Sequence, residues 1–168
     1  HYGHFETEMH RRYPNHHLVI RNICDEGDTP AFRPHAGRAN PWAFPGGDKF
    51  RPLVEAKDRW GGNSGAGHFK EPDGWLAQLK PDIIVAFFGY NESFHGPAGI
   101  PNFKAELEAF VAHTLKQNYN GKGPSKLTLV SPMAFQDLSK LYGTPNGTAE
   151  NANLALYSKA IEDVAASH

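Results

Sequence analysis

The sequence predicts an α/β fold with a mostly parallel sheet, and two observations carry this prediction. Segments with strand character alternate with segments of helical periodicity, in the order helix, strand, helix, strand, helix, strand, helix. Such alternation is typical of parallel sheets. The most apolar strand segment, residues 82–88, shows no alternation of polar and apolar side chains, which favours a central strand covered on both faces. The 168 residues suit one domain.

The first part of the chain predicts a helix, a strand and a long loop. Tyr2, Phe5 and Met9 recur at the spacing of one helix face, before a Pro-Asn pair that ends the pattern. Residues 18–23 form a short β-branched run that predicts a buried strand. Residues from about 25 to 70 lack periodicity and are rich in Gly, Pro and aromatic residues. We therefore interpret residues 1–168 as a single domain with a long loop, a feature that is usually functional in compact domains.

The rest of the chain predicts three helices around two strands. Pro72 and Asp73 open a short helix that precedes the strand at 82–88. Residues 103–115 carry apolar side chains at i, i+4, i+7, i+8 and i+12 and predict an amphipathic helix. Another apolar run, residues 127–130, predicts the next strand. Thr148 is the predicted N-cap of a last helix.

The composition excludes several classes of function. The formal net charge is −1 and the isoelectric point about 6.9, with no basic stripe of the kind that binds nucleic acid. No apolar stretch reaches the roughly 18 residues that a membrane span needs. Cys24 is the single cysteine, so neither an intrachain disulfide nor a cysteine-based metal site can form. The ten histidines include no HExxH pair, and we predict no metal site.

Two predicted strands run into unusual polar segments at their carboxyl ends. Residues 22–29 follow the first strand and contain Gly27, Asp28 and Thr29, and residues 89–92 follow the second. Either segment alone could be an ordinary turn. Ligands bind at the carboxyl ends of the strands in open parallel sheets, so the two segments together indicate a site.

These two segments resemble the motifs of the SGNH, or GDSL-type, hydrolase family. Asn22 to Thr29 fits the family's N-x-x-x-x-G-D-T segment, and Gly89-Tyr90-Asn91-Glu92 fits its G-x-N-D/E segment. The resemblance implies a three-layer α/β/α fold with a flavodoxin-like, mostly parallel sheet. It also implies a carboxylic-ester hydrolase acting on acyl or acetyl esters, including esters of carbohydrates. The backbone N–H of Gly27 and the side-chain amide of Asn91 would then form an oxyanion hole.

Three residues beside these donors are candidates for contacts with the substrate. Asp28 follows Gly27 directly, and Glu92 and His95 follow Asn91 closely in the chain. For Glu92 there is a second interpretation, because it takes the family's acidic position and could serve the hydrogen bonds of the turn instead. A cofactor is not expected, because no Gly-rich or Ser/Thr-rich phosphate loop precedes a helix; this also disfavours a flavodoxin-like cofactor binder.

The family's other catalytic motifs do not occur in the sequence. No serine follows a Gly-Asp pair, and His168 has Ala165 rather than an aspartate three residues before it. In the family's strand order, 2-1-3-4-5, the strands predicted here would be numbers 2, 3 and 4, which leaves a gap between residues 18–23 and 82–88. We therefore expect the domain to be incomplete in this chain and to need other segments or domains of a longer protein.

Two further segments resemble one subgroup of this family. The opening His1-Tyr2-Gly3-His4-Phe5-Glu6-Thr7 and the run from Asn91 to Phe94 resemble a bacterial subgroup of large multidomain proteins that are often exported. In that subgroup the serine block can be degenerate. Two functions therefore stay open: an ester hydrolase, and a non-catalytic relative that acts as a binding or interaction module of a larger protein.

Overall fold

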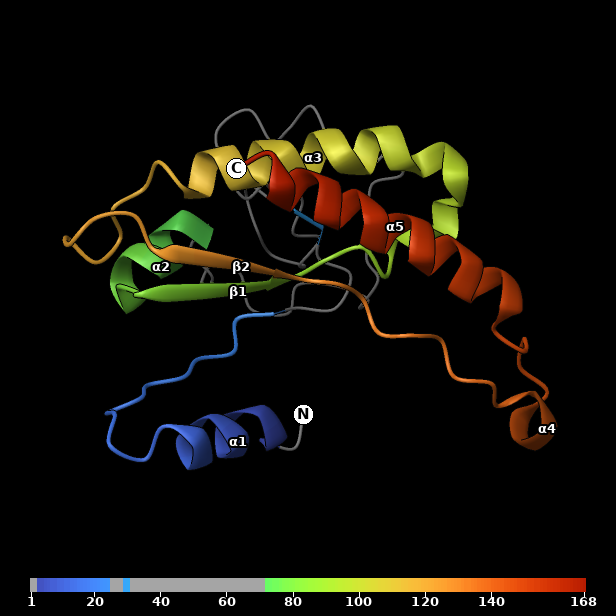
Figure 1. Ribbon diagram of the computed structural model, residues 1–168, viewed down its shortest axis with the longest axis horizontal. Coiled ribbons are helices and arrows are strands. Elements are labelled where there is room, and N and C mark those ends of the chain that lie inside the picture. Colours follow the sequence, from blue (N-terminus) through green and yellow to red (C-terminus); the bar gives the residue numbers. More distant parts are fainter. Residues whose placement is uncertain (1–2, 25–28, 31–71) are drawn as a thin grey trace, which may run out of the picture.

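The computed structural model describes residues 3–24, 29–30 and 72–168 (Figure 1). The long loop predicted at about 25–70 lies almost entirely outside these residues. The described helices and strands, in chain order, are α1 (His4–Arg12), α2 (Pro72–Leu79), β1 (Ile83–Phe87), the 3-10 helices η2 (Glu92–His95) and η3 (Pro97–Gly99), α3 (Ile100–Thr114), β2 (Lys126–Val130), α4 (Ser139–Tyr142) and α5 (Thr148–Ala166).

A two-stranded parallel sheet organises the described chain. β1 and β2 pair in register, from Ile83 opposite Lys126 to Phe87 opposite Val130. The chain between them passes through α3, as parallel neighbours require a crossover. α3 and α5 lie together along one side of the strand pair (Figure 1). The predicted α/β class, the two strands and their parallel pairing are thus confirmed.

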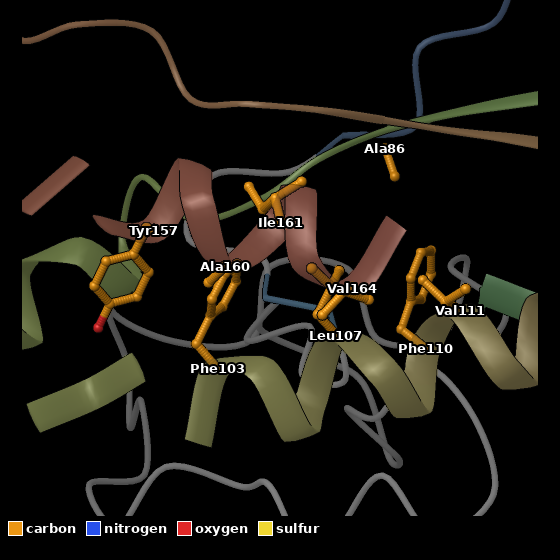
Figure 2. Packing of buried hydrophobic residues seen from close by; sticks show 9 residues of the cluster. All are labelled: Ala86, Phe103, Leu107, Phe110, Val111, Tyr157, Ala160, Ile161 and Val164. Carbon is orange, nitrogen blue, oxygen red and sulfur yellow. The ribbon is translucent and has the colours of Figure 1, made fainter. Parts of the chain in front are cut away.

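The core lies where α3 and α5 pack on each other and on the sheet (Figure 2). Both helices place apolar side chains at helical spacing on their facing sides, which is the pattern that predicted them. Their buried side chains, joined by Ala86 from β1, are Phe103, Leu107, Phe110 and Val111 of α3 and Tyr157, Ala160, Ile161 and Val164 of α5. Burial of each large apolar side chain stabilises the fold by roughly 1.5–3 kcal/mol.

The other face of the sheet carries exposed apolar side chains. Ile83 and Phe87 are 59% and 55% exposed, whereas Ala86, which points to the core, is 7% exposed. The prediction that this strand is covered on both faces is therefore wrong for the part of the chain that is described. α1 lies apart from the strands, on the side away from α3 and α5, and buries none of its residues (Figure 1).

Residues 18–23 do not form the predicted buried strand. The segment belongs to no sheet, and Val19 and Ile23 are 63% and 45% exposed. At its end the side chain of Asn22 accepts a hydrogen bond of 2.9 Å from the backbone N–H of Cys24. A strand needs a neighbour for its backbone groups, and within the described residues β1 pairs with β2 and not with this segment.

The helix boundaries follow the predictions with one correction. α1, α2, α3 and α5 form where the sequence pattern predicted helices. Thr148, however, is the first residue of α5 and not its N-cap. The cap position is Gly147, at φ 81°, and the Thr148 backbone N–H donates to the side chain of Asn146 at 3.1 Å. Within the described ranges, no helix is long and apolar enough to cross a membrane.

Candidate functional site

The candidate site begins at a tight turn after β1. Gly89 follows the strand with φ +101°, a conformation that side chains other than glycine rarely adopt. A Cβ atom at this position would also stand 3.3 Å from Cδ1 of Ile161 and 3.4 Å from Cζ of Phe103. The glycine thus lets the chain turn sharply while its backbone packs directly on the core.

Side chains of the turn itself hold it closed. The backbone N–H of Gly89 donates to Oε2 of Glu92 at 2.9 Å. The Ser93 N–H donates to the Gly89 carbonyl at 3.1 Å, and the Ser93 hydroxyl donates to the carbonyl of Tyr90 at 2.6 Å. These bonds fix residues 89–93 in one conformation and start the 3-10 helix η2.

Asn91 stands exposed at the top of this turn. It occupies the N-cap position of η2 with φ −63° and ψ −41°, and its side chain makes no capping hydrogen bond. The amide is a neutral donor with two N–H groups, and here it is carried by a backbone that other residues hold in place. Asn91 therefore lies exposed shortly after the carboxyl end of a parallel strand.

The other predicted donor, Gly27, and its neighbour Asp28 lie outside the described residues. The residue that follows them, Thr29, is described, and its hydroxyl donates to the carboxylate of Glu106 on α3. Pro30 is fully buried. The chain that leaves the Gly27 segment is thus attached to the same helix that packs under the Asn91 turn.

The side chain of Glu92 is buried beneath the turn. It is 7% exposed; Oε2 accepts the Gly89 N–H, whereas Oε1 is buried without a hydrogen-bond partner among the described residues. Burial is the main cause that raises the pKa of Glu92 to about 7; the charge of Glu106 also raises this pKa, and the backbone N–H groups of Glu92 and Gly89 oppose the rise. This geometry favours the second interpretation of Glu92, in which it serves the hydrogen bonds of the turn.

The remaining candidates lie on the surface. His95 is exposed at the end of η2, four positions after Asn91. His168, at the other end of the described chain, places Nε2 2.7 Å from the Glu108 carboxylate on α3. In the described ranges, no group of three or more His, Cys, Asp or Glu side chains could hold a metal ion.

Sequence reasoning missed an aromatic pair beside Asn91. Tyr90 and Phe94 are 36% and 62% exposed, and their rings meet edge to face with centroids 5.7 Å apart. The sequence did contain a signal for this pair, because Tyr90 and Phe94 lie on either side of Asn91 in an otherwise polar segment. Exposed aromatic rings next to a hydrogen-bond donor are suited to contact the apolar part of a ligand.

Comparison of the chain with protein-family models, with curated proteins and with solved structures found no match.

Proposed function

We propose that this chain forms part of an SGNH-type carboxylic-ester hydrolase domain, in which Asn91 and Gly27 donate hydrogen bonds to the oxyanion. The observation that carries the proposal is the Asn91 turn. An exposed side-chain amide stands at the carboxyl end of a parallel strand, on a backbone fixed by the Gly89–Glu92 hydrogen bond of 2.9 Å. The sequence around it matches the family's G-x-N-D/E segment.

The chemistry explains why this arrangement is suited to ester hydrolysis. When a serine attacks an ester carbonyl, the carbonyl oxygen becomes an oxyanion, and fixed N–H donors stabilise that charge. One such donor lowers the barrier by roughly 3–4 kcal/mol. The nucleophile and the base that activates it belong to motifs that these 168 residues do not contain, so the residues present supply charge stabilisation.

The proposed domain has the three-layer α/β/α architecture of that family. α3 and α5 supply one helical layer. The opposite face of the strands exposes Ile83 and Phe87, and α1 carries an unburied apolar residue, Phe5, that is 51% exposed. A parallel sheet is normally covered on both faces, so these exposed apolar surfaces support a second layer.

A non-catalytic binding module is the alternative function. It is favoured by the lack of a Gly-Asp-Ser block in the sequence and by the exposed Tyr90–Phe94 pair, which could hold a ligand without reaction. The ligand would then be a small molecule or a carbohydrate ester that uses the same Asn91 amide.

Ester hydrolysis by the intact protein separates the two functions. We expect turnover of a short-chain p-nitrophenyl ester that a serine-directed phosphonate abolishes. Asn91→Ala should lower kcat by about 10²–10³-fold, because it removes one oxyanion donor. Asn102→Ala, at an exposed position in the first turn of α3, is the matched control and should leave kcat unchanged.

Two results would contradict the proposal. Failure of the wild-type protein to turn over any short-chain ester would refute the hydrolase proposal and leave the binding module. Turnover that Asn91→Ala and Asn102→Ala affect equally would refute the oxyanion role of Asn91 even if the protein is an esterase.

A further inference from the structure

One face of α5 contacts both ends of the segment that carries Asn91. At the start of the segment, Cδ1 of Ile161 lies 3.3 Å from the position that a Cβ atom would take at Gly89. At its end, the hydroxyl of Tyr157 donates to the carbonyl of Gly96 at 3.0 Å. Tyr157 and Ile161 are four positions apart on α5, so both lie on the same face of the helix (Figure 2).

Backbone hydrogen bonds connect Asn91 to the residue that Tyr157 holds. The Asn91 carbonyl accepts the N–H of Phe94 at 3.3 Å, and the Ser93 carbonyl accepts the N–H of Gly96 at 3.0 Å. Gly96 is the C-cap of η2, a 3-10 helix of four residues. Because the hydrogen bonds of a 3-10 helix have poor geometry, a shift of Gly96 is expected to shift the backbone of Asn91 as well.

The hydroxyl of Tyr157 fits beside η2 because residue 99 is glycine. A Cβ atom at Gly99 would overlap the hydroxyl oxygen and would stand 2.7 Å from Cβ of His95. Gly99 has φ −79°, which any residue can adopt, so the close approach and not the backbone conformation requires glycine here. The Gly99 N–H also donates to the Gly96 carbonyl, at 3.1 Å. This carbonyl is thus fixed by two donors.

The ring and the hydroxyl of Tyr157 have different roles. Tyr157 is 0% exposed, and its ring lies 5.1 Å from that of Phe103 in the core. Phenylalanine would fill the same apolar space, whereas a buried hydroxyl is tolerated only with a hydrogen-bond partner. The partner is the Gly96 carbonyl, so the hydroxyl contributes to the turn and the ring to the core.

We propose that Tyr157 is a positioning residue of the candidate site: its hydroxyl, seated against Gly99, fixes the end of η2 and thereby the Asn91 amide. The role of Asn91 as an oxyanion donor rests on the proposed function. The attachment of η2 to α5 through Tyr157 can be tested without it.

Amide hydrogen exchange at Gly96 measures this attachment directly. His95-Gly96 is the single His-Gly pair in the 168 residues, so ¹³C-carbonyl histidine and ¹⁵N-glycine select this amide among them by NMR. In the intact protein, Tyr157→Phe should speed Gly96 exchange by roughly 2- to 10-fold, because one hydrogen bond is lost. Tyr119→Phe is the matched control: it removes a hydroxyl that donates to Asp73 of α2 at 2.6 Å and should leave the rate unchanged.

Two results of this comparison would overturn the proposal. Equal acceleration of Gly96 exchange in Tyr157→Phe and Tyr119→Phe would show a general loss of stability rather than a local release of η2. An unchanged rate in Tyr157→Phe would show that the hydroxyl does not hold η2.

A second variant tests the same contact from the other side. Gly99→Ala should displace the hydroxyl in a protein that keeps Tyr157, and should speed Gly96 exchange. The new methyl group meets Cβ of His95 whether or not the hydroxyl is present, so that part cancels in a double-mutant cycle. Gly99→Ala should therefore speed Gly96 exchange more in the wild-type background than in Tyr157→Phe. Equal effects in the two backgrounds would contradict the proposed seat of the hydroxyl.

The kinetic signature separates positioning of Asn91 from a purely structural role. Tyr157→Phe should lower kcat for a p-nitrophenyl ester by roughly 10- to 100-fold, because a small displacement of a catalytic donor is costly. KM should stay unchanged, because the oxyanion contact forms in the transition state. Tyr119→Phe should leave both constants unchanged. A wild-type kcat in Tyr157→Phe, despite faster Gly96 exchange, would limit the hydroxyl to a structural role and overturn the proposal.

Failure of this proposal and failure of the proposed function give different results. If the wild-type protein turns over no ester, the proposed function fails, and Gly96 exchange still decides whether Tyr157 holds η2. If esters are hydrolysed while Gly96 exchange ignores both Tyr157→Phe and Gly99→Ala, the hydrolase stands and the positioning role fails.

Discussion

Replacing Glu92 by glutamine is expected to abolish a pH dependence of the folding stability. The pKa of Glu92 is about 7 in the folded protein, against an ordinary value of 4.5, mainly because the carboxyl group is buried. Between these two values the folded state keeps a proton that the unfolded state releases. The stability that this group contributes is therefore fully present below pH 4.5 and is lost as the pH rises through about 7.

The magnitude follows from the difference between the two pKa values. A shift of this size corresponds to about 3 kcal/mol in total, and most of it, between about 2 and 3 kcal/mol, falls between pH 5 and pH 8. Because Glu92 is only 7% exposed, solvent screening reduces this little. Glutamine keeps an oxygen for the Gly89 N–H but cannot ionise, so the variant should lack this loss of stability.

Urea unfolding of the wild-type protein and of Glu92→Gln at pH 5, 6, 7 and 8 measures the effect. Titrating groups that the substitution does not affect contribute equally to both proteins and cancel in the difference. We expect the variant to gain between about 2 and 3 kcal/mol relative to the wild type from pH 5 to pH 8. A difference in the free energy of unfolding that stays constant over this range would refute the reasoning. Glu150→Gln, at a partly exposed side chain in the first turn of α5, serves as the control.

Two further predictions concern the turn and the core. Gly89→Ala should destabilise the fold by about 1–3 kcal/mol, because it forces a side chain into a positive φ and against the core. Gly121→Ala, also at positive φ but with no atom within 4 Å of the new Cβ, isolates the conformational part, so an equal loss in both variants would refute the steric part. Leu107→Ala should cost about 2–5 kcal/mol in urea unfolding, because Leu107 is 1% exposed. Leu156→Ala, at a side chain 43% exposed, should cost far less, and equal costs would contradict the assigned core.

The sequence was sufficient to predict the elements that bury one regular face. α3 and α5 have apolar residues at helical spacing, and each packs that face against the other, so the periodicity and the observed contacts describe the same surface. Residues 18–23 do not form the predicted strand, because the prediction used composition alone. Their β-branched composition fits a strand, but a strand also needs a hydrogen-bonded neighbour, and composition does not reveal whether one is present.

The candidate site was predictable only in part. The sequence singles out Asn91 as a candidate because its motif is contiguous. The Thr29–Glu106 contact could not be predicted, because it joins residues 77 positions apart and gives no local signal. From the sequence alone, Glu106 is expected to be an exposed charged residue of an amphipathic helix. Its burial becomes apparent only when α3 is placed against the turn that follows β1.

The turn after β1 departs from local stability rules in several ways. Within four residues it contains a glycine at φ +101° and a buried acid with an oxygen that lacks a partner in the described structure, beside an exposed aromatic pair. Each feature costs stability, since burial opposes the charge on Glu92 and positive φ restricts position 89 to glycine. The α3–α5 core, in contrast, follows the apolar pattern throughout. Departures of this kind concentrate at functional sites, where geometry is selected over stability, and this supports placing the site at Asn91.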